Sequence, residues 1–291
     1  MSDLDENFKE FVENWDRFRD RLVLFLGAGA SIGAVNKTGD KLLSAYELRN
    51  QLWTKFNRVD LAAWAPAELK LMSLEHAAAI VEAKAGRDEL SKHLVDVFSC
   101  DRPLWQHLVL PYLNPRVLFT TNYDELIELG YSRPTMYDVI CNDRAPMSNR
   151  VGLYKPHGSL SHTNQPVGHG GLVITQFDYL EMIVDYRKML RRFMTGFDGR
   201  CVLFVGYSFG DMDIGAELYS LRKQNSGTPW YAIFPRNDPP VRKMYSKRFS
   251  IEQMNLTFEQ FLLELDARVD FVPREFKHDK IDQLRAAGKV Q

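Results

Sequence analysis

RLVLFLGAGAS, residues Arg21 to Ser31, joins an apolar run to two closely spaced glycines. A continuous apolar run of this length is typical of a strand buried on both faces, as the strands of a parallel sheet are. Gly27 and Gly29 come directly after it, where a backbone without side chains can approach a phosphate group closely. The stretch therefore predicts the first strand of an α/β fold, followed by a loop that can bind a phosphate.

The spacing of the glycines separates classes of phosphate-binding loop. The pattern is G-x-G-x-x-x-G, not the G-x-G-x-x-G of hydride-transfer dehydrogenases, and no G-K-[ST] of a P-loop is present. Glu47 lies about 20 residues downstream, but it forms a helix cap with Ser44 and does not end a second strand. The pattern therefore argues against a dehydrogenase. A purely structural turn stays open as an alternative.

Strand and helix signals alternate along the rest of the chain. Further strands are predicted at Val117–Thr120, Gly152–Tyr154, Leu172–Thr175, Val202–Val205 and Tyr231–Phe234. Helices are predicted at residues 4–20, from the Ser44–Glu47 capping box through Phe56, and at Tyr179–Thr195.

This alternation predicts an α/β fold with a doubly wound, mostly parallel Rossmann-like sheet. Residues 42–112 have a helical pattern without a convincing strand, so we expect a helical insertion after the first strand. The expected division is a Rossmann-like core with N- and C-terminal helices, residues 1–34 and 113–291, and a helical insertion, residues 35–112.

The composition excludes several classes of protein. Lys plus Arg number 37 and Asp plus Glu 38, a net charge of −1, so there is no electrostatic reason to expect nucleic-acid or membrane binding. The N-terminus has no apolar signal region, and no apolar run is long enough for a membrane span. Cys100, Cys141 and Cys201 are too few and too scattered for a disulfide framework or a four-cysteine zinc site. We expect a cytoplasmic protein without a bound metal.

Polar side chains follow two of the later strands. Thr121, Asn122 and Asp124 come directly after Val117–Thr120, and His157 follows another short strand in LYKPHGSL. Asn and Asp often cap helices, and a lone histidine is more often structural than catalytic. In open parallel sheets, however, ligands bind beyond the carboxyl ends of the strands. We therefore expect these side chains to share one site with the glycine loop.

The segment CVLFVGYSFGDMDI raises an alternative. Gly206–Gly210 matches the G-x-S-x-G of α/β-hydrolases with Ser208 as nucleophile, and GHGG at Gly168–Gly171 imitates their oxyanion loop. Such an enzyme needs an acid and then a histidine downstream of the serine, and the sequence offers only His278, in a polar tail. A polar tail is a poor place for a buried base, so the hydrolase is the weaker hypothesis.

Taken together, these segments resemble the sirtuin family, in its bacterial, zinc-less branch. GAGAS at Gly27–Ser31 is similar to the family's first NAD-binding turn, TTNYD at Thr120–Asp124 to its T-x-N-x-D segment, and KPHGS at Lys155–Ser159 to its catalytic histidine-glycine motif. GYSFGD at Gly206–Asp211 is similar to the turn that holds a ribose, and VITQFDYLEMI to the TxxDY segment of the bacterial branch. The four-cysteine zinc module and the Phe-Arg pair of protein-deacylating sirtuins are missing, which argues against an acyl-lysine groove.

The resemblance implies a function and roles for named residues. The substrate would be NAD, cleaved at its nicotinamide–ribose bond to ADP-ribose and nicotinamide, an activity that this branch uses in anti-phage defence. The implied catalytic residues are His157 as general base, Asn122 at the ribose or attacking water, and Asp124 at the nicotinamide carboxamide. The implied NAD-binding residues are Gly27, Ala28, Gly29, Ser31, Thr121, Gly206, Ser208 and Asp211. A module that senses NAD or ADP-ribose without cleaving it remains an alternative.

Regulation is expected because uncontrolled NAD hydrolysis would be toxic to the cell that carries it. We therefore predict a homo-oligomer whose activity depends on assembly or on a partner, and the resemblance suggests a ring-forming ATPase as one such partner. The N-terminal helix and the C-terminal apolar stripe of Phe258, Phe261, Leu262 and Leu265 are candidate contact surfaces. Packing of both helices on the sheet is the alternative.

Overall fold

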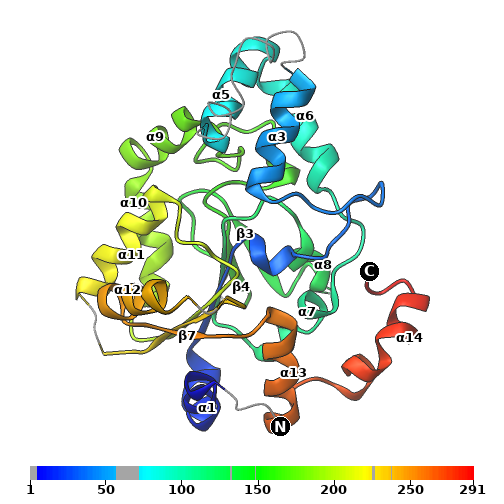
Figure 1. Cartoon of the computed structure of the whole chain (residues 1–291), viewed down its shortest axis with the longest axis vertical. Coiled ribbons are helices and arrows are strands. Elements are labelled where there is room, and N and C mark those ends of the chain that lie inside the picture. Colours follow the sequence, from blue (N-terminus) through cyan, green and yellow to red (C-terminus); the bar gives the residue numbers. More distant parts are fainter. Residues whose placement is uncertain (1–4, 57–71, 132, 148, 225–226, 237) are drawn as a thin grey trace.

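A seven-stranded sheet in strand order β3-β4-β2-β1-β5-β6-β7 forms the centre of the protein (Figure 1). The computed structural model describes residues 5–56, 72–131, 133–147, 149–224, 227–236 and 238–291. All neighbouring strands are parallel. The strands are β1 (Leu22–Leu26), β2 (Val117–Thr120), β3 (Tyr137–Ile140), β4 (Val151–Tyr154), β5 (Cys201–Val205), β6 (Trp230–Ile233) and β7 (Ile251–Met254). The predicted fold class is confirmed.

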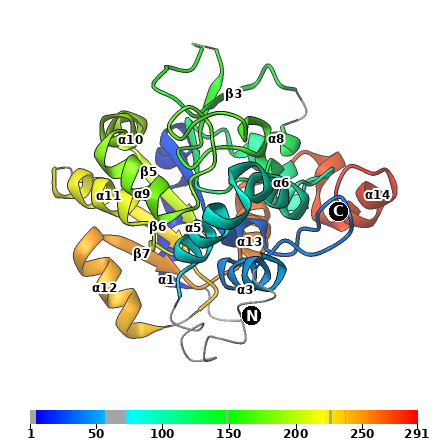
Figure 2. The same ribbon diagram turned by 90° about the horizontal axis from the view of Figure 1, so that it is seen from above.

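Helices cover both faces of the sheet. One face carries α1 (Glu6–Glu13), α2 (Trp15–Phe18), α7 (Trp105–Leu108), α8 (Leu126–Gly130), α13 (Phe258–Val269) and α14 (Ile281–Ala286). The other carries α9 (Gln176–Val184), α10 (Arg187–Met194), α11 (Met212–Gln224) and α12 (Pro239–Phe249), as Figures 1 and 2 show. In β1, Leu24 packs into the first core and Phe25 into the second, and both are fully buried. The apolar run of β1 follows from this burial on both faces.

The predicted helical insertion, residues 35–112, follows β1 and contains, where the structure describes it, α3 (Ala45–Phe56), α5 (Leu74–Ala85), α6 (Arg87–Phe98) and α7, the last of which packs on the sheet. The predicted capping box is confirmed, because Ser44 N donates to Glu47 Oε2 at 2.8 Å and Glu47 N donates to Ser44 Oγ at 3.3 Å. Residues 57–71, predicted as helical, lie outside the described residues.

Helices α3, α5 and α6 of the insertion form an apolar cluster together with the segment that follows β4. Leu52 and Leu94 of the insertion pack with Leu160, Leu172 and Ile174. These three helices lie together at the top of Figure 1. The boundaries at residues 35 and 112 stay a prediction, because part of this cluster comes from the Rossmann-like part of the chain.

Several predicted elements differ from the structure. Leu172–Thr175 is not a strand: its apolar residues are buried in a loop, and Thr175 is the N-cap of α9. The apolar run therefore reflects burial without strand pairing. The predicted helix Tyr179–Thr195 is two helices, α9 and α10, and the predicted helix at residues 4–20 is α1 and α2 followed by a 3-10 turn at Arg19–Arg21.

The two edge strands, β3 and β7, were missed in the sequence. Each pairs with one neighbour only. Polar residues interrupt their apolar patterns, Asp138 in β3 and Glu252 and Gln253 in β7. Short edge strands need fewer apolar residues, so their sequence predicts a strand less clearly.

The two helices that the sequence offered as contact surfaces are packed on the sheet. Phe8 and Phe11 of α1 and Phe261 of α13 are fully buried in one core, and their rings contact one another. The stripe of α13 is buried along its length. The packing alternative is therefore the one that the structure supports.

No helix in the described ranges combines the length and apolar character of a membrane span.

Two glycine turns touch at the carboxyl ends of β1 and β5. Gly27 N donates to Val205 O and Gly29 N to Gly206 O, both at 2.9 Å. A Cβ atom on Gly29 would lie 2.5 Å from the Cα atom of Gly206, whose own φ of +59° favours glycine. Backbone atoms on both sides cannot move aside as a flexible side chain can. The close approach of the two turns therefore requires glycine.

We predict that Gly29→Ala lowers the free energy of unfolding by about 1–3 kcal/mol, the usual cost of overpacking. Gly215→Ala in α11 is the matched control, because an added Cβ atom there meets nothing within 4 Å. It should stabilise the helix by up to about 1 kcal/mol. Urea unfolding of both variants and the parent measures the difference. Equal stability of Gly29→Ala and the parent would contradict the close approach.

Candidate functional site

Four chain segments meet at one edge of the sheet. They follow β4, β2, β1 and β5, which are consecutive neighbours in the strand order. Because all the strands are parallel, their carboxyl ends open on the same edge. The segments carry the sequence-predicted residues His157 (after β4), Thr121 to Asp124 (after β2), Gly27 to Ser31 (after β1) and Gly206 to Asp211 (after β5).

Asn122, Ser31 and Asp124 form one hydrogen-bonded network across β1 and β2. Asn122 Nδ2 donates to Ser31 Oγ and to Gly27 O, each at 3.1 Å. Ser31 Oγ donates to Asp124 Oδ2 at 2.9 Å, and Leu126 N donates to Asp124 Oδ1 at 3.1 Å. The structure therefore brings together the predicted amide, carboxylate and loop serine. Thr121 is half-buried beside them in the chain.

Asp124 is buried, which makes its charge costly. Burial raises the pKa of the Asp124 carboxyl group, against the opposing effects of Lys155, the Leu126 N–H and Ser31. Both carboxylate oxygens accept hydrogen bonds, which stabilise the ionised form. This Asp is therefore more than a helix cap.

His157 pairs with a residue that the sequence analysis missed. Its Nε2 atom lies 3.0 Å from Oδ2 of Asp213 at the start of α11, and both side chains are almost fully buried. Burial lowers the pKa of His157, but Asp213 and Asp211 outweigh it, so the pKa is raised above its usual 6.5. The pKa of Asp213 is lowered: burial acts to raise it, and the His157 partner prevails. The pair favours an imidazolium next to a carboxylate.

The sequence signal for Asp213 was present but ambiguous. In GDMDI, Asp211 and Asp213 alternate, and only Asp211 falls within the quoted motif. Met212 between them is exposed, whereas Asp213 is 2% exposed. Buried ionised carboxylates are normally paired, and this pairing became visible only with the fold.

GHGG, read in the sequence as a possible oxyanion loop, holds the histidine segment in place. Gly158 has φ of +85°, and a Cβ atom there would lie 2.3 Å from Gly171 O. Ser159 N donates to Gly170 O, and Val173 N donates to His157 O. These contacts account for the glycines without a catalytic role.

Ser208 does not have the surroundings of a hydrolase nucleophile. Ser208 is exposed, and in this turn the non-glycine residue with left-handed backbone is Phe209 (φ +58°), not Ser208. In a nucleophile elbow the serine itself occupies the strained turn. His278 lies 2.8 Å from Glu259 of α13 and against Trp105 of α7, on the opposite face of the sheet from α11. It cannot serve as the base for Ser208.

The glycine loop continues as a four-residue 3-10 helix, Ala28–Ser31. The Gly27 and Gly29 amides are already used in hydrogen bonds to β5 and its turn. The loop therefore offers little helix dipole, and its glycines serve the packing of the two turns. Ala28 is exposed, and the Ser31 side chain is buried in the Asn122 network.

Within the described ranges, no group of three or more His, Cys, Asp or Glu side chains is arranged to hold a metal ion. Cys100, Cys141 and Cys201 are all buried free thiols.

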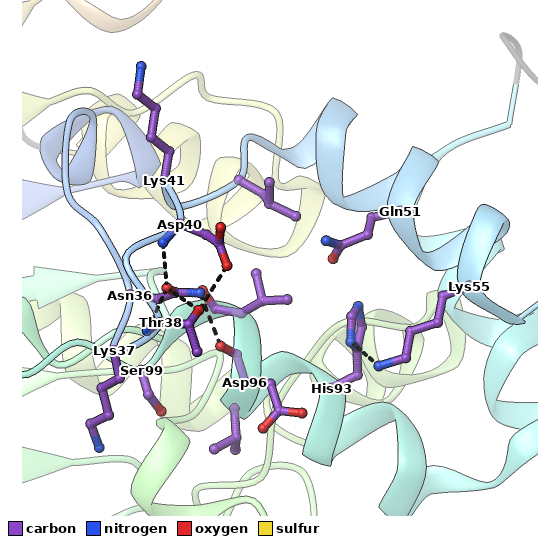
Figure 3. A pocket seen from close by; sticks show the side chains of 13 residues that line it. Asn36, Lys37, Thr38, Asp40, Lys41, Gln51, Lys55, His93, Asp96 and Ser99 are labelled. Atoms are coloured by element: carbon purple, nitrogen blue, oxygen red, sulfur yellow. Dashed lines mark hydrogen bonds between the residues drawn. The ribbon is translucent and has the colours of Figure 1, made fainter.

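A cavity of about 810 Å³ lies away from these residues, between the Asn36–Lys41 turn, α3 and α6 (Figure 3). None of the sequence-predicted site residues lines it. Lys55 donates to Nδ1 of buried His93 at 2.8 Å. Burial lowers the pKa of His93 to about 4, with Lys55 acting in the same direction. In Figure 3, Lys37 and Lys41 lie on the opposite side of the cavity from Gln51 and His93, and their side chains point away from these residues. The lysines therefore do not converge on one anion.

The comparisons with known proteins agree with the motifs. Residues 116–258 match the SIR2-like domain. The predicted resemblance to sirtuins is confirmed at this level. The matched range includes Asn122, Asp124, His157 and Asp213, whereas the glycine loop precedes it.

Among curated proteins, the chain is 30% identical over 152 residues to defense-associated sirtuin 2 of Bacillus subtilis, covering 50% of this chain and 15% of that protein. It is 27% identical over 227 residues to NAD(+) hydrolase ThsA of Cytobacillus dafuensis, covering 74% and 40%. It is 25% identical over 279 residues to NAD(+) hydrolase ThsA of Acinetobacter baumannii (strain 532279), covering 91% and 51%. The chain thus spans between 15% and 51% of the lengths of these relatives.

We predict that Asp213→Asn lowers the pKa of His157, because burial then acts with less opposition. NMR titration of the His157 ring measures the change, and an unaltered midpoint would contradict the pairing.

The pairing of His157 with Asp213 also makes the free energy of unfolding depend on pH. A raised folded-state pKa stabilises the protein below the unfolded pKa, and this contribution is lost as the pH rises through the folded value. The variant should therefore lose more stability at about pH 6 than at about pH 9, measured by urea unfolding.

Proposed function

We propose that this protein cleaves the nicotinamide–ribose bond of NAD, releasing nicotinamide and ADP-ribose. The observation that supports this most is the meeting of the Asn122–Ser31–Asp124 network with the His157–Asp213 pair at one edge of the sheet. The SIR2-like domain and the two relatives named NAD(+) hydrolase support NAD as the substrate.

His157 is the general base in this proposal. Its Nε2–H donates to Asp213, so the neutral ring has Nδ1 as its proton acceptor. Asp213 fixes this tautomer and stabilises the imidazolium that forms when Nδ1 takes a proton from a ribose hydroxyl or a water molecule. The raised pKa makes the base stronger, and activity should increase as the pH rises through that pKa.

Asn122 and Asp124 bind the reacting end of NAD. Departure of nicotinamide leaves oxocarbenium character on the ribose, so catalysis depends on positioning and electrostatic stabilisation. The Asn122 side chain is half-buried and holds the ribose or the attacking water. Asp124 accepts from the nicotinamide carboxamide.

The remaining predicted residues bind the rest of the dinucleotide. The turn Gly27–Ser31 lies next to the Gly206 turn, and together they form the surface on which the diphosphate and the adenosine ribose lie; the Gly27 and Gly29 amides, already hydrogen-bonded, are not the donors. Ala28, Thr121, Ser208 and Asp211 are all at least partly exposed around this edge, as contact residues must be.

We further propose that the protein is a regulated effector of bacterial anti-phage defence. The relative named defense-associated sirtuin 2 supports this role. A homo-oligomer and a partner such as a ring-forming ATPase stay predictions. Since the apolar faces of α1 and α13 are packed on the sheet, no such contact can use those faces.

We predict that His157→Ala and Asn122→Ala each reduce nicotinamide release from NAD by about 10²–10⁴-fold, the usual contribution of a positioned base or orienting group. His169→Ala is the control, because the exposed His169 side chain contacts the Tyr186 ring and not the residues of the two networks, and the substitution leaves the glycines of GHGG in place. Release is measured by chromatography, with thermal unfolding as a check on the fold. A folded His157→Ala variant with the turnover of the parent would refute the mechanism. NAD binding by a parent that releases no nicotinamide would favour the sensing module.

We predict that Ser208→Ala raises KM for NAD more than it lowers kcat, because an exposed hydroxyl contributes binding and not chemistry. Initial rates over a range of NAD concentrations measure both constants. A serine-directed fluorophosphonate should leave the parent unlabelled. Covalent labelling of Ser208 would instead support the hydrolase.

A further inference from the structure

Lys155 is a fully buried lysine that no function has been assigned to above. Its side chain is 0% exposed. The Nζ atom donates to Asp124 O at 2.7 Å, to Glu128 Oε1 at 2.9 Å and to Tyr123 O at 3.5 Å. An ammonium group has three N–H donors, so these acceptors satisfy it. A buried cation with this set of partners is a built feature of the fold.

The lysine links two segments of the candidate site. It follows β4 and precedes His157 by two residues, and its backbone N donates to Ile140 O of β3. Its Nζ atom donates hydrogen bonds to the carbonyl groups of Tyr123 and Asp124. Both belong to the loop after β2, which also carries Asn122. The Lys155 ammonium group therefore joins the Asn122–Asp124 loop to the His157 segment, alongside the hydrogen bond from Leu160 N to Tyr123 O at 3.2 Å.

The lysine is also the cation among several titratable groups. Around Asp124 these are Glu125 on its own loop, Glu128 of α8 and the Cys100 thiol after α6. Around Lys155 they are Asp124, Glu128 and the Cys141 thiol. Burial lowers the pKa of Lys155, and Glu128 and Asp124 outweigh this, so the pKa is raised. The ammonium form is therefore retained.

We propose that Lys155 is a positioning residue of the site: its ammonium group fixes the Tyr123–Asp124 backbone next to the His157 segment and places a positive charge beside the buried Asp124 carboxyl group. This inference rests on the proposed function for its turnover readout only. The competing explanation is structural, since Lys155 could serve solely to neutralise Glu128 of α8. Removal of one partner of a buried pair is costly under either explanation, so a single variant cannot decide.

The experiment compares three variants of the full chain. Lys155→Met removes the cation at similar side-chain length. Lys155→Met combined with Glu128→Leu removes both members of the ion pair, which often restores stability. Glu128→Gln keeps Lys155 and an acceptor for it, and serves as the matched control. Thermal unfolding, nicotinamide release and a ¹³C NMR titration of the Asp124 carboxyl group are measured for each.

If Lys155 positions the site, the double variant recovers the thermal stability of the parent but still releases nicotinamide about 10²-fold more slowly, the cost expected of a misplaced reacting group. Its Asp124 carboxyl group titrates at a higher pH than in the parent. Glu128→Gln keeps the rate of the parent. Recovery of both stability and rate in the double variant would overturn the proposal.

The NMR readout separates this inference from the proposed function. If the parent releases no nicotinamide, the proposed function fails, and the Asp124 titration alone decides the role of Lys155. An upward shift in both lysine variants supports the role. An unchanged midpoint in the folded double variant refutes it.

Discussion

The contact between the Gly29 and Gly206 turns is the constraint on which the site depends. β1 is central in the sheet, with β2 on one side and β5 on the other. Because both turns lack a side chain where they meet, the chain leaves β1 and β5 almost in backbone contact. This brings Ser31 within reach of Asp124 on the β2 side, while the β5 segment continues to Asp213 beside His157. A wider separation at this point would displace both networks.

Burial acts against a negative charge in the Asp124 network and against a positive charge in the His157 pair. Around Asp124, burial opposes the negative charge and raises the pKa of the carboxyl group, although a buried lysine and two hydrogen bonds act in the other direction. Around His157, burial opposes the positive charge, and two aspartates restore it. Each ionised group thus depends on a partner from a different strand end. Charge balance of this kind can be assembled only after the sheet has formed, which connects the electrostatics of the site to its topology.

Much of this arrangement could be predicted from the sequence, and the rest could not for identifiable reasons. Apolar runs located β1, β2 and β5, and the polar residues that follow β2 and β4 located Asn122, Asp124 and His157. Leu172–Thr175 was misread because a buried loop and a buried strand have the same composition. Asp213 and Lys155 were missed because the pairing of a charge depends on distance in space. The Gly27 and Gly29 positions were predicted with an incomplete reason: their hydrogen-bonded amides show that they serve turn packing.

The apolar cluster shared by the insertion and the segment after β4 has a consequence for synthesis of the chain. Leu52 and Leu94 find part of their core only in Leu160, Leu172 and Ile174, which emerge from the ribosome much later. Until then the insertion helices expose apolar surface on a nascent chain, the situation in which chaperones bind. A fragment that ends before residue 160 would keep that surface exposed permanently. The insertion is thus an early part of the sequence whose apolar core is completed only by a late one.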